Sequence, residues 1–550
     1  MAKRAKYPPH TNRFVRLACV CLSLLPIACQ KENVGLQLVA EGFGNGRNSK
    51  VAIDGLHSNW VDGESVRING VNKTVTVDGS QAYLPDVPNA GTYRAIYPDS
   101  LNSTATLTDD NLTVSIPHNY NYMEADGHQH LGSPMVAYGT SDRRLMFKHL
   151  TAAITVEIKN IYGFTIEIDS ITVSSNLYQL SGDRNITLGE SIAISALASA
   201  TAADRQVKIC FPTTHLRLIA GTTRQVQIPV LPVGNNNRFT ITINAHKVDD
   251  ADVLCQFQQT QGNAQATYSL ERAQLGYAGA TLGKAFSISD SKKVIISQGN
   301  LQYTPATAVW AFATHQYDIC ETGPIDSTTR YRADGTDPID LFAFGTSGFN
   351  NMYPYMTSST LTDYAAPTTS ISQTDYDWGY HNAISNGGNA TGQWYTLSSN
   401  QWKYLLNTRT TSTVGINSNN TTLYTLATIG GTHKGLILFP DEYTHPADIT
   451  TLSEASFNAE SDSTAAVSYS DWNKMEAAGA VFLPCASYRY FQNERNPVTY
   501  IGSPIQGMYW TAGGSSLTKS RYYVFNFTLV PTSREQSRYY GMSVRLVKDL

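Results

Sequence analysis

Two residues near the start of the chain have the surroundings that covalent processing requires. Cys29 follows Ala28 at the end of an apolar stretch, 17–27, which comes after a cluster of lysines and arginines. This order is typical of a lipoprotein signal peptide, residues 1–29, in which Cys29 is acylated and holds the protein on a membrane. The spacing within the apolar stretch is imperfect, so an ordinary signal peptide cut near Ala28 stays an alternative.

Arg47 is the second candidate for covalent processing. It lies in a polar, glycine-rich stretch directly after the alternating segment 35–40. Alternation of apolar and polar residues predicts a half-buried strand at 35–40. Proteases cut exposed chain of the composition found around Arg47. Cleavage after Arg47 would remove the predicted strand, whereas an ordinary surface arginine is the simpler alternative.

Other combinations of reactive side chains are weaker. Asp375 and Asp377 could act as paired carboxylates, but we expect them to cap turns around a buried Trp378. His118 and the segment 126–130 could bind a metal ion, although a solvated loop is the expected structure. The sequence lacks the serine-hydrolase, metalloprotease and phosphate-loop motifs. We therefore expect no enzymatic activity, no metal and no cofactor.

Four cysteines follow Cys29, namely Cys210, Cys255, Cys320 and Cys485. Disulfides Cys210–Cys255 and Cys320–Cys485 would each stay within one predicted domain. Free, buried cysteines are an equally good expectation.

Composition indicates an exported protein with a binding surface. Only 15% of the 550 residues are charged, and 32 are tyrosine. The net charge of −4 gives no electrostatic reason to expect nucleic acid as a partner. No segment after Cys29 has the roughly 18 apolar residues of a membrane-spanning helix.

The pattern along the chain predicts a mainly β protein with three domains after the signal peptide. Residues 30–143 and 144–285 both consist of short alternating runs broken by Gly, Asn, Asp and Pro, which favours two consecutive antiparallel β-sandwiches. Residues 286–550 are richer in Tyr, Trp and Gly, and predict an α+β domain. Helices are expected within 397–409 and 468–479, where a serine precedes a helix-compatible run.

The segment "GNGRNSKVAIDGLHSNWVDGESVRING" resembles the start of fimbrillin-type pilins, the FimA/Mfa-like superfamily of type V pili. Those proteins typically have an arginine before a strand and then a Trp-x-x-Gly-Asp/Glu-x-Val segment. The matching residues are Arg47, Trp60, Asp62, Gly63, Glu64 and Val66. The resemblance covers residues 30–285 and is a diffuse pattern.

Residues 286–550 resemble a different family. The ordered motifs "DLFAFGTSGFNN", "DWGYHNAISNGG", "VFLPCASYRY", "YWTAGGSS" and "RYYGMSVRLVKD" are similar to FISUMP-type domains. These domains are related in fold to sulfatase-modifying factor and to C-type-lectin-like domains. In pilus systems they are found on minor, tip-type subunits, which the resemblance implies for this chain.

The two resemblances together imply a function. A protease that cuts after Arg47 would free the body from the lipid anchor and open a groove for a donor strand from another fimbrillin subunit. The segment "SVRLV" near the end of the sequence should be buried in its own domain, so the chain would accept a strand without giving one. The expected protein is a tip subunit at the cell outer membrane and in the fimbria. The alternative is an uncleaved outer-membrane lipoprotein that binds glycans for nutrient capture.

Aromatic residues in predicted loops are the candidates for contact with a host or bacterial surface glycan or protein. Tyrosine offers a large, rigid and amphipathic contact surface. The candidates for ligand binding are Tyr376, Tyr380, Tyr488, Tyr490 and Phe491. Five tryptophans are expected to lie in the core instead, namely Trp310, Trp378, Trp402, Trp472 and Trp510.

Overall fold

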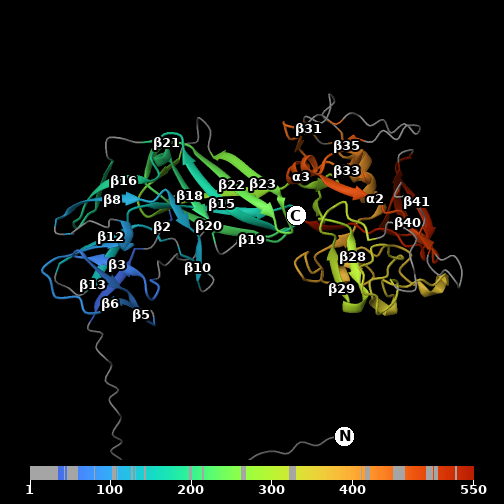
Figure 1. Ribbon diagram of the computed structural model, residues 1–550, viewed down its shortest axis with the longest axis horizontal. Helices are drawn as coiled ribbons and strands as arrows, with labels where there is room; N and C mark the ends of the chain where they lie inside the picture. The colour runs from blue at the N-terminus through green and yellow to red at the C-terminus, as the bar shows by residue number, and fades with distance from the viewer. Residues whose placement is uncertain are drawn as a thin grey trace, which may run out of the picture.

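The structure is a computed structural model of the chain. It describes residues 35–41, 44–45, 60–79, 81–101, 107, 109–125, 128–130, 132–140, 144–196, 201–212, 216–261, 268–320, 330–410, 412–414, 422–449, 452, 465–490, 499–500, 506–526 and 529–550. Cys29, Arg47 and Phe491 lie outside these residues. Figure 1 shows an elongated molecule with an N-terminal lobe and a C-terminal lobe.

An eight-stranded sheet forms one end of the N-terminal lobe, in the order β4-β3-β7-β12-β13-β1-β6-β5. Its strands are β1 Leu36–Ala40, β3 Ser65–Ile68, β4 Val71–Thr74, β5 Thr76–Asp78, β6 Gln81–Leu84, β7 Tyr93–Tyr97, β12 Met135–Gly139 and β13 Arg144–His149. Ala95 belongs to the core on one face of this sheet, and its neighbour Ile96 belongs to the core on the other. Successive residues of a strand face opposite ways, so both faces of the sheet are covered.

A small sheet covers one of those faces, in the order β17-β16-β8. Its strands are β8 Asn111–Ile116, β16 Gly182–Thr187 and β17 Ala193–Ala196. Val114 and Ile186 from this sheet share a core with Ile96. Strands from both sides of residue 144 therefore meet in one sheet.

The middle of the molecule is a sandwich of two sheets, in the orders β2-β25-β14-β20 and β23-β22-β15-β18-β9 with β19 beside β15. The strands are β2 Gly44–Asn45, β9 Asn119–Asn121, β14 Ala152–Asn160, β15 Ile166–Ser175, β18 Gln206–Cys210, β19 Leu216–Leu218, β20 Thr223–Val230, β22 Phe239–Lys247, β23 Asp250–Gln261 and β25 Gln274–Leu282. Ile154 and Val156 from one sheet pack with Ile241 and Ile243 from the other in a shared core. These residues alternate along their strands, as the sequence pattern predicts.

In its described residues, the C-terminal lobe combines short sheets with three α-helices. Its main sheets are β26-β27-β42-β30, β35-β32-β33-β36 and β39-β40-β41, and β28 pairs with β29. Their strands are β26 Phe286–Ser287, β27 Lys293–Ile296, β28 Leu301–Thr304, β29 Val309–Phe312, β30 Tyr395–Thr396, β32 Tyr424–Ile429, β33 His433–Leu438, β35 Ala465–Val467, β36 Val481–Pro484, β39 Gln506–Gly514, β40 Lys519–Asn526, β41 Leu529–Ser537 and β42 Leu546–Asp549.

Smaller paired strands and turns complete the described elements. The pairs are β10 Met123–Ala125 with β11 His128–His130, β21 Val233–Asn237 with β24 Tyr268–Leu270, β31 Thr413–Val414 with β34 Tyr443–Thr444, and β37 Arg489–Tyr490 with β38 Thr499–Tyr500. Short 3-10 turns are Asp99–Leu101, Ala203–Arg205, Pro305–Thr307, Phe349–Asn351 and Leu361–Asp363.

Two of the helices, α2 and α3, begin where the sequence predicts. In α2, Ser399–Lys403, the Gln401 amide donates to Ser398 Oγ at 3.3 Å, and the Ser398 amide donates to Gln401 Oε1 at 2.8 Å. This reciprocal capping satisfies two N–H groups at the helix start. A π-helical turn, Tyr404–Thr408, continues α2. The helix α3 is Tyr469–Ala477, with Ser468 as its N-terminal cap. The helix α1 is Trp378–His381.

The prediction of a mainly β protein is confirmed. Most neighbouring strands are antiparallel, but β1 lies parallel to β13, and β14 lies parallel to β25. Alternation along a strand carries no information about the direction of its neighbour, so these parallel pairs were not predicted. The expected tryptophan positions are confirmed, because Trp310, Trp378, Trp402, Trp472 and Trp510 are all at most 5% exposed.

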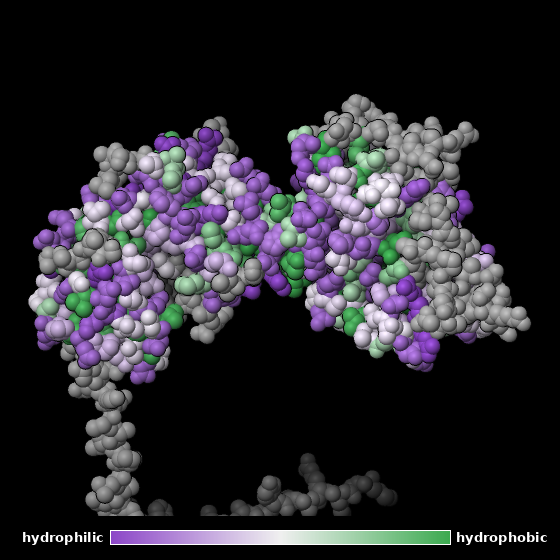
Figure 2. Space-filling model, in the orientation of Figure 1, coloured by the Kyte–Doolittle hydropathy of each residue, from purple (hydrophilic) through white to green (hydrophobic). Residues whose placement is uncertain are grey.

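The two lobes meet at a narrow junction. Figure 2 shows a largely hydrophilic surface with hydrophobic residues gathered at this junction. The end of the chain lies there (Figure 1), and Lys548 Nζ donates to the Ala220 carbonyl across it at 2.9 Å. Tyr162 Oη donates to the Ala477 carbonyl at 2.5 Å. The lobes are thus joined by specific contacts as well as by the chain.

Candidate functional site

The strand β1 lies inside the eight-stranded sheet, between two strands that are distant from it in sequence. Gln37 to Ala40 run parallel to Arg144–Phe147 of β13, and Leu36 to Leu38 run antiparallel to β6. The side chains of Leu36 and Leu38 are 0% and 4% exposed and belong to the core of this sheet. The strand β1 is therefore an interior strand of this sheet, with a hydrogen-bonded neighbour on each side.

The end of β1 is fixed by a polar cluster. The Glu41 amide donates to the Phe147 carbonyl at 2.8 Å, and the Glu41 carboxylate forms an ion pair with Arg272. Burial lowers the pKa of His149 to about 4, so its ring is neutral at pH 7. His149 Nε2 lies 2.8 Å from the Glu41 carbonyl, and a neutral ring protonated at Nε2 donates there.

The chain then reaches the second sheet system. Gly44 and Asn45 form β2, which pairs in parallel with Gln274 and Leu275 at the edge of the four-stranded sheet. The segment 36–45 thus adds one strand to each of two sheets. Losing this segment would leave unpaired backbone in both, because β1 and β2 are neighbours of β13, β6 and β25.

The strand β42, near the other end of the sequence, is also an interior strand of its sheet. It lies between β27 and β30, and Leu546 and Val547 are at most 1% exposed. The expectation that "SVRLV" is buried in its own part of the protein agrees with this placement. The strand β42 is therefore engaged in its own sheet.

The aromatic candidates fall into two separate ring clusters. Tyr376 packs edge-on against Phe349, whose ring also contacts His381, and Tyr380 is 36% exposed nearby on α1. Tyr488 and Tyr490 contact Tyr540 instead, with ring centroids 5.6 and 5.9 Å away. No ring contact among the described residues joins the two clusters, so the structure does not bring all the candidates into one site.

The cluster of Tyr488 and Tyr490 is the better-defined surface. Arg489 between them is 1% exposed and donates to the Leu341 carbonyl at 2.7 Å. Because side chains alternate along a strand, the buried Arg489 turns both tyrosines toward the half-exposed side. Tyr539 and Tyr540 join them, with ring centroids 5.0 Å apart, and sequence reasoning missed both. The two adjacent tyrosines in "RYYGM" are the sequence feature that could have identified them.

Asp375 and Asp377 do not form a carboxylate pair. Asp377 is fully buried, and its carboxylate accepts from the Thr396 amide and hydroxyl, both at 2.8 Å. Burial raises the pKa of Asp377 to about 6. Asp375 is exposed and lies 3.2 Å from His381 Nδ1. The structural role expected from the sequence, polar groups around the buried Trp378, fits these contacts.

Of the two alternatives left open for the four cysteines, the structure has the one without disulfides. Cys210, Cys255, Cys320 and Cys485 are all free. Cys210 on β18 and Cys255 on β23 are separated by two intervening strands, β15 and β22. Strands lie about 4.8 Å apart, so this separation far exceeds the roughly 7 Å that a disulfide can bridge between Cα atoms.

Possible metal ligands are scattered. Across the part of the chain that the structure describes, no group of three or more His, Cys, Asp or Glu side chains is placed to hold a metal ion. His118 Nδ1 instead lies 2.7 Å from Ser181 Oγ. Asp126, and the side chains of His128 and His130, lie outside the described residues. Within the same described part, no helix has the length and apolar content to cross a membrane.

Comparison with known proteins gives structural likenesses only. No family model and no curated protein matches the sequence. A fimbrial protein of Bacteroides ovatus is 9% identical over 94% of this chain and 99% of its own, with a TM-score of 0.24. A candidate cell adhesion protein of Bacteroides ovatus is 12% identical over 45% of this chain and 91% of its own, with a TM-score of 0.27. A fimbrial protein of Bacteroides vulgatus is 8% identical over 45% of this chain and 95% of its own, with a TM-score of 0.21. No functional conclusion follows from likenesses of this size.

Proposed function

We propose that this chain is a cell-surface fimbrial subunit that becomes competent to bind another subunit's strand when its own first strand is removed. The observation that carries the proposal is the position of β1. It fills the middle of a sheet, its inward side chains complete a core, and the candidate cleavage residue Arg47 follows it by only seven residues.

The geometry around β1 supports replacement by a strand from another chain. Removal would uncover the backbone edges of β13 and β6 and the cavities that Leu36 and Leu38 fill. A donor strand with apolar side chains at alternate positions would restore both the hydrogen bonds and the core. Head-to-tail contacts of this kind extend into filaments because they do not close.

The position of β42 supports placing this subunit at a tip. A donor strand must be free to enter another subunit, whereas β42 is paired on both sides within its own sheet. The proposed subunit accepts a strand through its N-terminal lobe and presents its C-terminal lobe outward.

Processing after Arg47 is the first prediction. Surface-exposed protein should begin at Asn48, and an Arg47→Ala variant should keep an acylated Cys29 at its N-terminus. N-terminal sequencing and mass spectrometry of surface protein check this. Lys50→Ala, which changes a basic residue in the same stretch, is the matched control and should leave processing unchanged. Wild-type surface protein that keeps acylated Cys29 would instead support an uncleaved lipoprotein that binds glycans.

Adhesion through the cluster of Tyr488 and Tyr490 is the second prediction. Flat rings on the half-exposed side can stack on sugar faces, and removal of a central contact residue often weakens binding tenfold or more. The double variant Tyr488→Ala, Tyr490→Ala in the full chain should lose at least about tenfold in binding to its best target on a glycan array. Tyr277→Ala, which removes a 55% exposed tyrosine on β25, is the control. Equal binding by both variants would contradict this role.

A further inference from the structure

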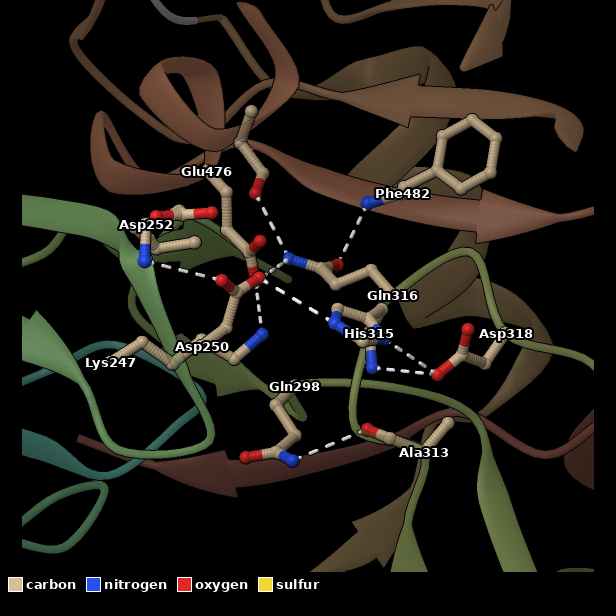
Figure 3. Close-up of polar contacts among 12 residues, drawn as sticks. Lys247, Asp250, Asp252, Gln298, Ala313, His315, Gln316, Asp318, Glu476 and Phe482 are labelled. Atoms are coloured by element: carbon tan, nitrogen blue, oxygen red, sulfur yellow. Dashed lines mark hydrogen bonds and ion pairs between the residues drawn. The ribbon is translucent and has the colours of Figure 1, made fainter. Parts of the chain in front are cut away.

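A buried polar cluster lies where α3 of the C-terminal lobe meets the sandwich (Figure 3). Lys247 is the last residue of β22, Glu476 lies on α3, and Gln316 comes from the loop after β29. Their exposed fractions are 1%, 2% and 2%. Polar side chains this deeply buried are costly unless their partners are well placed.

The hydrogen bonds in this cluster bring an amine and an amide to one carboxylate oxygen. Lys247 Nζ donates to Glu476 Oε1 at 2.9 Å, and Gln316 Nε2 donates to the same oxygen at 3.1 Å. The Lys247 ammonium also lies 5.2 Å from the centre of the Phe164 ring. The amine and the amide therefore share one acceptor oxygen, and an aromatic ring lies next to the amine.

The carbonyl oxygen of the same amide is held by two donors. The Phe482 amide donates to Gln316 Oε1 at 2.8 Å, and Arg545 Nη2 donates to it at 2.6 Å. Donors aimed at a carbonyl oxygen stabilise the negative charge that develops there when a nucleophile attacks the carbon. The cluster thus contains a nucleophile, a polarised acyl group and a shared proton acceptor.

We propose that Lys247 and Gln316 form an intramolecular isopeptide bond. Glu476 takes a proton from the Lys247 ammonium, and the freed Nζ attacks Gln316 Cδ to form a C–N bond. The oxyanion formed on Oε1 is held by the Phe482 amide and the Arg545 guanidinium. Glu476 passes the proton to Nε2, and the Cδ–Nε2 bond breaks to release ammonia. Glu476 then takes the second proton from the attacking Nζ and gives it to the ammonia, which leaves as ammonium. No oxidant, reductant or co-reactant is consumed.

Two further features favour this reaction. The unreacted cluster holds two buried cations, Lys247 and Arg545, and one buried carboxylate, that of Glu476. The nearby carboxylate of Asp250 is engaged elsewhere, because its Oδ2 lies 3.7 Å from His315 Nε2. Condensation removes the charge of Lys247 and leaves one buried cation and one anion. A cavity of about 20 Å³ borders Gln316 and Glu476, which is room for one small molecule such as the departing ammonia.

The bond would lock the two lobes together. Lys247 belongs to the sandwich, and Gln316 belongs to the C-terminal lobe, so tension between the lobes would pass through a covalent link at their junction. This inference does not depend on the proposed fimbrial function.

Mass spectrometry of the wild-type full chain under denaturing conditions tests the proposal directly. The protein should be lighter than its sequence by one ammonia. Trypsin should fail to cut after Lys247, and a branched peptide should join Phe239–Arg272 to Val294–Arg330. Recovery of the unlinked peptides Phe239–Lys247 and Val294–Arg330, with the full sequence mass, would overturn the proposal.

The variant Glu476→Gln removes the proton acceptor at nearly constant shape and should yield only unlinked peptides. Glu167→Gln, which changes another buried carboxylate on β15 in the sandwich, is the matched control and should stay linked. A linked Glu476→Gln protein would overturn the role of Glu476. The wild-type measurement decides the bond itself even where a variant fails to fold.

Discussion

Replacing Leu38 with glutamate is expected to release β1 from its sheet. Leu38 is 4% exposed and lies between Leu145 of β13 and Ala82 of β6. The variant loses a buried leucine and brings a carboxylate into the core, which should lower the free energy of local unfolding by on the order of 5 kcal/mol. Hydrogen exchange of the uncleaved variant checks this, because the amides of β13 should exchange faster than in the wild-type chain.

The neighbouring residue supplies a matched control. Gln37 is half-buried, and alternation along β1 turns it away from the core that holds Leu38. Gln37→Glu introduces the same charge at the adjacent position and should change local stability by no more than about 0.5 kcal/mol. Equal protection of β13 in both variants would mean that β1 contributes little to the sheet.

Hydrogen exchange is the appropriate measure because the chain contains several cores. A single unfolding transition cannot be assumed for a protein of this kind. Exchange reports the opening of one sheet at a time and thus separates the N-terminal sheet from the sandwich and the C-terminal lobe.

Much of the local structure could be predicted from the sequence. The alternation in "LQLVA" predicts β1, and its boundaries agree with Leu36–Ala40. Serine caps predict the starts of α2 and α3, because a serine side chain satisfies free N–H groups at a helix start. The position of "SVRLV" was anticipated from its resemblance to a terminal core strand.

Pairings between distant strands could not be predicted in the same way. Alternation fixes which side chains face inward, but it does not select the neighbour of a strand or its direction. The sequence therefore gave no sign that β1 lies parallel to β13, or that β16 pairs with β8 across the predicted boundary at 143–144.

The polar cluster at the junction was missed for a related reason. Lys247, Gln316 and Glu476 are far apart in sequence, and each stands among residues of ordinary composition. Their chemistry arises only where β22, α3 and the loop after β29 meet. The tyrosine candidates show the opposite difficulty. They share one residue type and similar predicted loops, yet the fold packs them into two separate clusters.

Trimming at Arg47 is expected to have the largest effect on the molecule. A chain that begins at Asn48 lacks both β1 and β2, so β13, β6 and β25 each lose a paired neighbour. The core also loses Leu36 and Leu38, at about 2–5 kcal/mol for each buried leucine. Amides of these three strands should exchange much faster than in a control chain that begins at Asn33 and keeps β1.

The most direct test adds the missing segment back in a separate molecule. A synthetic peptide of residues 35–45 should bind the chain that begins at Asn48, and it should restore slow exchange in β13, β6 and β25. A peptide with glutamate in place of both Leu36 and Leu38 should do neither. If the trimmed chain is already as protected as the control, stays monomeric and ignores the peptide, then β1 is not a replaceable strand and the proposed mode of assembly is wrong.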